Sequence, residues 1–115
     1  MSVKIYHNPR CSKSRDTLKL LEAQGIQPEI ILYLKKPPTA IELQDILLKL
    51  AIKPHALLRT KETEYMDNDL DDPSLSDAEL IDAMVRIPRL IERPIVLANG
   101  KAAIGRPPEN VLEIL

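Results

Sequence analysis

The sequence predicts an α/β fold with a mixed four-stranded sheet, and three observations support this prediction. The chain has 115 residues, 44% of them hydrophobic, which is enough to build one domain with its own core. Its N-terminal part reads as strand, helix and strand, the order of a parallel crossover. Near the C-terminal end, Asn99-Gly100 separates two strand-like runs, as in an antiparallel hairpin. We therefore expect a single domain over residues 1–115.

The N-terminal elements are predicted from short apolar runs and from residues that punctuate them. Residues 3–6 form a short β-branched and aromatic run, which predicts a strand. It leads into a loop at His7-Asn8-Pro9, where proline disfavours helix at the preceding residue. The first helix is expected to begin just after Cys11, with Ser12 as its N-cap and Gly25 at its C-terminal cap. The continuous apolar run 29–33 indicates a second strand covered on both faces.

The central part of the chain is expected to be an inserted helical segment. Two capping boxes, Thr39 with Glu42 and Ser76 with Glu79, predict helix starts. A helical turn is also expected from Pro54 to near Arg59. Apolar residues follow the capping boxes at helical spacing: Leu43, Ile46, Leu47 and Leu50 after the first, and Leu80, Ile81, Met84 and Ile87 after the second.

The C-terminal part predicts the second half of the sheet. Residues 94–98 and 101–104 read as an antiparallel pair joined by a type I′ turn, and residues 108–115 can form a short closing helix. The full order is then β-α-β, helices, and β-β-α. This order matches a thioredoxin-like α/β fold with a mixed four-stranded sheet.

The charge balance of the chain conceals two unlike parts. Sixteen basic against seventeen acidic residues give a net charge of −1, which argues against a domain that binds nucleic acid through overall positive charge. Nine of the acidic residues and no basic ones lie in residues 62–82, so the remainder holds sixteen basic and eight acidic residues, a net of +8. The acidic segment is expected to be a solvated loop and helix start, or else a mobile flap near the basic residues.

A single cysteine excludes an internal disulfide. The sequence shows neither a signal peptide nor eighteen consecutive apolar residues. We therefore expect a cytoplasmic protein with no membrane partner and with its thiol reduced. No Cys/His cluster suits zinc and no glycine-rich phosphate loop is present, so no bound metal or cofactor is expected.

Cys11 lies between a predicted strand and a predicted helix. There the unpaired N–H groups and the positive end of the helix dipole favour a thiolate, and Arg10, Lys13 and Arg15 add positive charge nearby. The competing interpretation is an inert buried cysteine. The motif is C-x-x-S, with Ser14 in the last place, so any covalent or oxidised state of Cys11 must be discharged by an external thiol.

Three arginines are candidates for binding an anion. Arg59, Arg93 and Arg106 each stand at the boundary of a predicted element, where binding residues are common, although a single such arginine is more often a solvated surface residue. His7 could hold the thiolate or assist a proton transfer, or it could cap a loop. Ser14 could donate a hydrogen bond to the thiolate, or it could be an exposed serine of the first helical turn.

Several separated motifs closely resemble the glutaredoxin-dependent arsenate reductase family of thioredoxin-like proteins, and the match runs over residues 5–115. The motifs are His7-Asn8-Pro9-Arg10-Cys11-x-x-Ser14-Arg15, Ala56-Leu57-Leu58-Arg59, Leu80-Ile81-Asp82, Arg93-Pro94-Ile95-Val96 and Gly105-Arg106-Pro107. The resemblance implies an enzyme in which Cys11 attacks arsenate to form a covalent thioarsenate. Glutathione then attacks as co-substrate, glutaredoxin removes the mixed disulfide, and arsenite leaves.

The resemblance also implies roles for individual residues. Arg59, Arg93 and Arg106 would hold the oxyanion, and His7 and Ser14 would support the thiolate. Pro94 would be the family's cis-proline before the third strand. Around the nucleophile the chain departs from the family pattern. The family usually has a small residue before the cysteine and Gly-Thr after it, where this chain has Arg10 and Ser12-Lys13.

Two other functions stay open at this point. Spx-like regulators of the same broad fold bind RNA polymerase, but they typically carry C-x-x-C, and Ser14 counts against that function. A monothiol oxidoreductase acting on glutathionylated proteins would need only Cys11. The extra charge next to the nucleophile could alter the choice of anion or the docking of the thiol partner.

Overall fold

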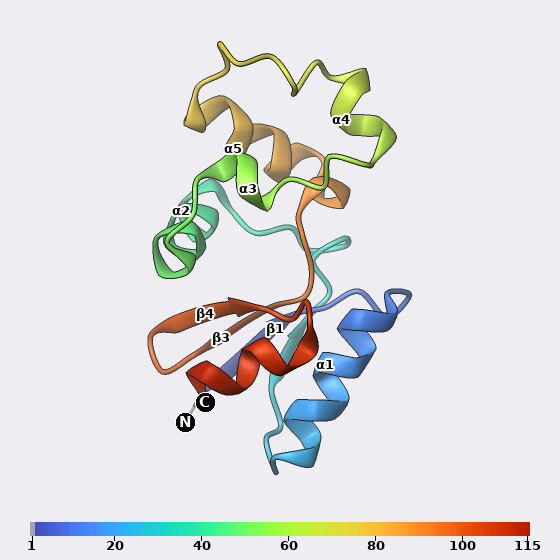
Figure 1. Ribbon diagram of the computed structural model, residues 1–115, viewed down its shortest axis with the longest axis vertical. Coiled ribbons are helices and arrows are strands. Elements are labelled where there is room, and N and C mark those ends of the chain that lie inside the picture. The colour runs from blue at the N-terminus through green and yellow to red at the C-terminus, as the bar shows by residue number, and fades with distance from the viewer. Residues whose placement is uncertain (1) are drawn as a thin grey trace. The chain divides into compact units, whose positions relative to one another are not determined.

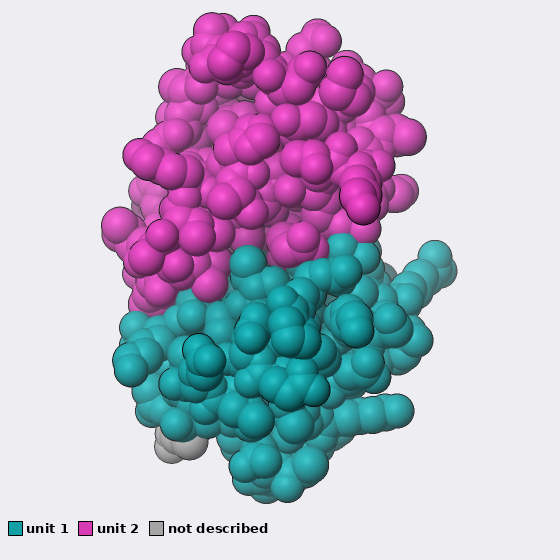
Figure 2. Space-filling model, viewed as in Figure 1, with its two compact units in different colours: residues 1–36, 93–115 teal, residues 37–92 magenta. Residues whose placement is uncertain are grey.

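The computed structural model describes residues 2–115 and divides the chain into two compact units, coloured separately in Figure 2. Unit 1 comprises residues 1–36 and 93–115, and unit 2 comprises residues 37–92. The expectation of one domain over residues 1–115 stays a prediction. Every helix among residues 2–115 is too short or too polar to cross a lipid bilayer.

Unit 1 contains the predicted mixed sheet, with strand order β2-β1-β3-β4 (Figure 1). Strand β1 (Val3–Tyr6) pairs in parallel with β2 (Glu29–Ile31) and antiparallel with β3 (Ile95–Ala98), which pairs antiparallel with β4 (Lys101–Ile104). Asn99 and Gly100 have φ angles of 55° and 72°, as a type I′ turn requires. The predicted parallel crossover and C-terminal hairpin are therefore confirmed.

The core of unit 1 lies between the sheet and two helices. Helix α1 (Ser12–Ala23) and the 3₁₀ helix η2 (Pro108–Ile114) pack against each other beside the sheet (Figure 1). Because side chains alternate along a strand, residues at every second position of β1 and β3 share the face that meets these helices. The buried residues of this core are Val3, Ile5, Leu21, Val96, Ala98, Val111 and Ile114.

Two predictions about unit 1 are wrong in detail. Strand β2 is an edge strand whose Ile30 is 47% exposed, so the apolar run there is not covered on both faces. An apolar run shows that its residues are hydrophobic, but it does not show how many other elements pack against the strand. The N-cap of α1 is Cys11 rather than Ser12, because the carbonyl of Cys11 already accepts the first helical hydrogen bond, from the N–H of Arg15 at 3.0 Å.

Unit 2 is the predicted helical segment. It contains α2 (Ala40–Leu50), α3 (Pro54–Leu57), α4 (Thr63–Asp67), α5 (Asp77–Arg86) and the 3₁₀ helix η1 (Pro88–Leu90). Both predicted capping boxes form, with reciprocal hydrogen bonds of 2.9 and 3.1 Å at α2 and 3.1 Å each at α5. The buried residues of α2 and α5 include Leu43, Ile46, Leu47, Leu80, Ile81 and Met84.

The acidic segment 62–82 is less of a loop than expected. It contains α4 and the start of α5, and Tyr65 and Leu70 within it are buried. Its first two carboxylates, Glu62 and Glu64, form ion pairs within unit 2. The solvated-loop prediction is correct for the turns around Asp71 and wrong around α4, where Tyr65 in the helix and Leu70 after it are buried.

Gly105 determines how closely β4 and its following loop approach α1. A Cβ at this position would collide with the side-chain oxygen of Thr17 and would lie 2.8 Å from Cγ of Pro94. Thr17 itself is fully buried, and its hydroxyl donates to the carbonyl of Lys13 at 2.8 Å. The close approach places the loop that carries Gly105 and Arg106 against Thr17 of α1.

We predict that Gly105→Ala destabilises the protein by about 1–3 kcal/mol, because a methyl group is forced into a filled space. Urea denaturation of the wild type and the variant measures this change. The matched variant is Thr17→Ala combined with Gly105→Ala, which removes the nearest colliding atoms. Its loss of stability should be smaller than the sum of the two single losses, and strictly additive losses would contradict the collision.

Candidate active site

Cys11 ends a loop that connects β1 to α1 and that is held by its own hydrogen bonds. The N–H of Cys11 donates to the carbonyl of Asn8 at 3.0 Å, and the N–H of Arg10 donates to the side-chain oxygen of Asn8, also at 3.0 Å. The N–H of His7 donates to the carbonyl of Ile31 at 2.8 Å, which ties the loop to the end of β2. The position of Cys11 at the start of α1 is therefore preorganised.

The surroundings of the Cys11 sulfur favour the thiolate. The residue is 8% exposed, and this burial by itself raises the pKa of the thiol. The backbone N–H groups of Ser14 and Lys13 and the positive charges of Arg93 and Arg106 act in the opposite direction and outweigh burial. The net pKa of Cys11 lies below the usual value for a cysteine, as expected for a reactive residue.

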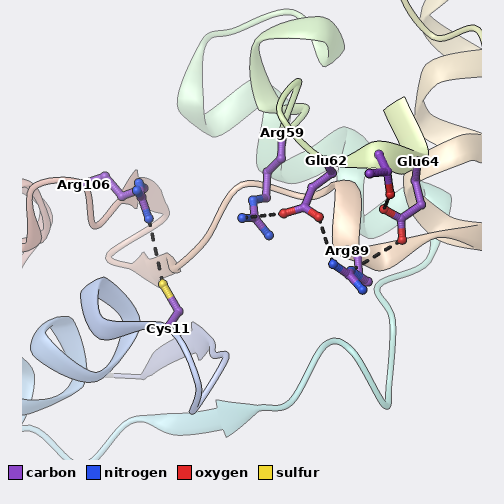
Figure 3. Close-up of polar contacts among 7 residues, drawn as sticks. Cys11, Arg59, Glu62, Glu64, Arg89 and Arg106 are labelled. Atoms are coloured by element: carbon purple, nitrogen blue, oxygen red, sulfur yellow. Dashed lines mark hydrogen bonds and ion pairs between the residues drawn. The ribbon is translucent and has the colours of Figure 1, made fainter. Parts of the chain in front are cut away.

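Arg106 lies directly beside the sulfur. Its Nη1 donates toward Cys11 Sγ at 3.9 Å, and Figure 3 shows the guanidinium pointing at the sulfur. The N–H of Gly105 donates to the carbonyl of Pro94 at 2.9 Å, which joins the two loops that carry Arg93 and Arg106. The Arg93-Pro94 peptide bond is cis, as the resemblance implied, and the Arg106-Pro107 bond is also cis, which we did not predict.

The charges that lower the pKa of Cys11 differ from those expected. We expected the side chains of Arg10, Lys13 and Arg15 to act, but the lowering charges belong to Arg93 and Arg106. The Arg15 guanidinium instead donates to the carbonyl of Pro9 at 2.9 Å. Successive residues at a helix start point in different directions, so closeness in sequence does not bring their charged ends to the sulfur.

His7 and Ser14 form a buried pair under the Cys11 loop. Their Nδ1 and Oγ atoms are 2.7 Å apart, and Ser14 Oγ also accepts from the N–H of Asn8 at 3.0 Å. Burial, and secondly the charge of Arg15, lower the pKa of His7 and favour a neutral imidazole. Ser14 is fully buried, so it is not an exposed helix residue, and it favours the thiolate through its backbone N–H. The thiolate-supporting role of both residues stays a prediction.

Arg59 belongs to unit 2, where it is part of an ion-pair chain (Figure 3). Its Nη2 lies 2.7 Å from one carboxylate oxygen of Glu62, whose other oxygen lies 2.9 Å from Arg89. Arg89 also pairs with Glu64 at 3.5 Å. The side chains of Arg59 and Glu62 are only 22% and 15% exposed, so the guanidinium is held in a defined position.

Sequence reasoning did not find Glu62 and Arg89. The separation of Arg59 and Glu62 by three residues was the available signal, because such pairs are neighbours on a helical turn. The structure brings Cys11, Arg93 and Arg106 together in unit 1, and the predicted role of Arg59 stays a prediction. Over residues 2–115, no cluster of three or more His, Cys, Asp or Glu residues could hold a metal ion.

Comparison with known proteins extends over almost the whole chain. The model of the ArsC family matches residues 6–114. The arsenate reductase of Haemophilus influenzae is 57% identical over 116 residues, covering both chains completely. The uncharacterized protein YfgD of Escherichia coli K12 is 58% identical over 114 residues, covering 98% of this chain and 96% of the relative.

A solved structure gives the same result for the fold. The arsenate reductase of Vibrio cholerae superposes with a TM-score of 0.98 at 54% identity, covering 100% of this chain and 98% of that one. The predicted thioredoxin-like α/β fold is thereby confirmed. From the family match, the identities and the fold together, the chain belongs to the ArsC family.

Proposed function

We propose that this protein is an oxidoreductase that reduces arsenate to arsenite. The observation that supports this function most directly is the pair of guanidinium groups, Arg93 and Arg106, beside a cysteine of lowered pKa. A thiolate supplies the nucleophile and the guanidinium groups supply donors for a tetrahedral anion. Relatives 57% and 50% identical to this chain are named arsenate reductases, in agreement with the proposal.

The first chemical step is attack of the Cys11 thiolate on the arsenic atom. A sulfur–arsenic bond forms, and one arsenate oxygen takes up protons and leaves as water. Arg93 and Arg106 balance the negative charge of the oxyanion and of the approaching sulfur, which would otherwise repel each other. The arsenic is still in its oxidised state after this step.

The two electrons that reduce arsenic must come from outside the chain. Cys11 is the only cysteine in the sequence, so no second thiol can form an internal disulfide. In our proposal, glutathione attacks the covalent intermediate and glutaredoxin removes the glutathionyl group as a mixed disulfide. These two external thiols are oxidised to a disulfide, and their two electrons reduce the arsenic. Water then cleaves the sulfur–arsenic bond, so arsenite leaves and Cys11 returns as the free thiolate. This chemistry needs a reducing compartment such as the cytoplasm.

We predict that the wild type consumes NADPH in an arsenate-dependent way when coupled through glutathione, glutaredoxin and glutathione reductase. Cys11→Ser should abolish turnover, and Arg106→Ala should lower kcat/KM by about 10²- to 10³-fold because an oxyanion donor is lost. Arg86→Ala is the matched control, since it removes an exposed guanidinium paired within α5. No turnover above Cys11→Ser would refute the proposed function.

We predict that Cys11 reacts as a thiolate at a pH below that of an ordinary cysteine. The pH dependence of its alkylation rate by iodoacetamide measures this pKa. Arg106→Ala should move the midpoint to higher pH, because one of the charges that lower the pKa is removed. By linkage, the thiolate stabilises the fold above the usual thiol pKa, and this contribution falls as pH drops through the lower native pKa. An unchanged midpoint in the variant would contradict the assigned cause.

We predict that Arg59→Lys lowers kcat/KM for arsenate about tenfold or more, because lysine keeps the charge but lacks the planar fork that binds oxyanions. The matched control is Arg89→Lys, the same change in the same ion-pair chain. It should leave arsenate reduction nearly unchanged. Equal losses in both variants would mean that the ion pairs support the fold and that Arg59 does not bind the anion.

A further inference from the structure

Glu62 lies at the centre of the ion-pair chain of unit 2 and has no role in the chemistry described so far. One of its carboxylate oxygens is 2.7 Å from Nη2 of Arg59, and the other is 2.9 Å from Nη2 of Arg89 (Figure 3). The Glu62 side chain is only 15% exposed. Because each oxygen is bound to a different arginine, the carboxylate cannot turn without breaking a charge-assisted hydrogen bond.

The backbone of Glu62 is also held by hydrogen bonds. Glu62 is the N-cap residue of α4, its N–H donates to the carbonyl of Arg59 at 3.2 Å, and its carbonyl accepts from the N–H of Tyr65 at 3.1 Å. Tyr65 is buried, and its hydroxyl oxygen lies 2.8 Å from Nε2 of His55 in α3. The chain on both sides of Glu62 is therefore tied down within unit 2, which gives the carboxylate a defined place.

The two ends of Arg59 are held by different partners. Its backbone N–H donates to the carbonyl of Leu90 at 2.8 Å, and the neighbouring residues Leu58 and Ile91 form an isolated antiparallel bridge. These backbone contacts fix the Cα of Arg59, but an arginine side chain has several rotatable bonds beyond that atom. The direction of the guanidinium therefore depends on the group bound at its far end, which is the carboxylate of Glu62.

The ion pair holds the Arg59 guanidinium without occupying all of it. A guanidinium has five N–H donors on three nitrogens, arranged in a planar fork that matches an oxyanion. Glu62 gives Arg59 only one oxygen, at Nη2, because its other oxygen is bound to Arg89. The pair is thus not the two-bond contact that would fill one whole edge of the guanidinium. Arg59 can be fixed by Glu62 and still donate to an anion.

We propose that Glu62 is a positioning residue for the proposed reaction, in which it fixes the direction of the Arg59 guanidinium while Arg89 fixes Glu62. The proposal rests on the proposed function, because there Arg59 binds the oxyanion. The negative charge of Glu62 lowers the positive potential at Arg59, so it opposes the binding of an anion. The benefit of Glu62 lies instead in geometry, which acts on the rate of the chemical step. Its removal should therefore change kcat rather than weaken arsenate binding.

The first test is the Glu62→Gln variant in the coupled arsenate assay. Glutamine keeps the size of the side chain, but its single oxygen cannot accept from both arginines. We expect kcat to fall about tenfold, less than the roughly 10²-fold loss that a displacement of about 1 Å can cause. The KM for arsenate should not rise, because a negative charge has been removed. An unchanged kcat, or a raised KM with kcat unchanged, would overturn the proposal.

Two comparisons separate positioning from a general support of the fold. Glu64→Gln is the matched control, the same change in a carboxylate that pairs with Arg89 at 3.5 Å, and it should leave kcat nearly unchanged. An equal fall in this control would overturn the proposal. In an Arg59→Ala background, Glu62→Gln should lower kcat by less than about twofold, because a residue that acts through Arg59 has nothing left to position. A fall as large as in the wild-type background would also overturn it.

A second measurement needs no turnover. The Nη groups of Arg59 are observed in ¹H–¹⁵N spectra, where hindered rotation of the guanidinium gives separate signals and free rotation gives averaged ones. Arg59→Lys identifies the signals. We expect separate signals in the wild type and averaged ones in Glu62→Ala, which removes the ion pair. Averaged signals in the wild type, or separate ones in Glu62→Ala, would overturn the proposal.

The same spectra distinguish failure of the proposal from failure of the proposed function. If the wild type shows separate Arg59 signals that Glu62→Ala averages, but reduces no arsenate, the proposed function is refuted while Glu62 still orients Arg59. If the wild type reduces arsenate and its Arg59 signals are averaged, the proposed function is supported and the positioning role of Glu62 is overturned.

Discussion

The site depends on one electrostatic requirement, the compensation of a negative charge on the sulfur of Cys11, a residue that is only 8% exposed. Burial alone favours the neutral thiol, so the thiolate exists only because donors and cations are arranged around it. The start of α1 supplies the N–H groups of Ser14 and Lys13, and two loops flanking the hairpin supply Arg93 and Arg106. The fold of unit 1 can be understood as the means of bringing these distant segments together.

To bring Arg106 to the Cys11 sulfur, the chain must pack closely, and this close packing restricts which residues can stand at particular positions. Arg106 is 95 residues from Cys11 in the sequence, and it reaches the sulfur from a loop whose first residue, Gly105, touches Thr17 of α1. Only a residue without a side chain leaves room for this approach. Behind the loop of Cys11, the buried pair of His7 and Ser14 fills the space and bonds to the backbone of Asn8. The sulfur of Cys11 can therefore gain or lose its proton while the packing around it fixes its position.

Much of this fold could be predicted from the sequence because local signals agreed with one another. The two capping boxes and the Asn99-Gly100 turn depend only on residues close together in the sequence, and all three formed as predicted. The errors at β2 and around Cys11 share a physical origin, since each depended on distant neighbours. The exposure of Ile30 depends on what covers β2, and the charges near Cys11 depend on which loops fold back onto it. For the site, the residue types were predictable from the sequence, whereas the ion-pair partners of Arg59 required the structure.

The division of charge along the chain can now be related to the chemistry. Part of the acidic segment pairs with arginines inside unit 2, where Glu62 bridges Arg59 and Arg89. In unit 1, by contrast, the positive charges of Arg93 and Arg106 help to lower the pKa of Cys11. In the proposed reaction the Cys11 thiolate approaches an oxyanion, and like charges repel each other in a small site. A chain with a net charge of −1 thus places two arginines where their charges act on its one cysteine, while Glu62 in the acidic segment pairs with other arginines.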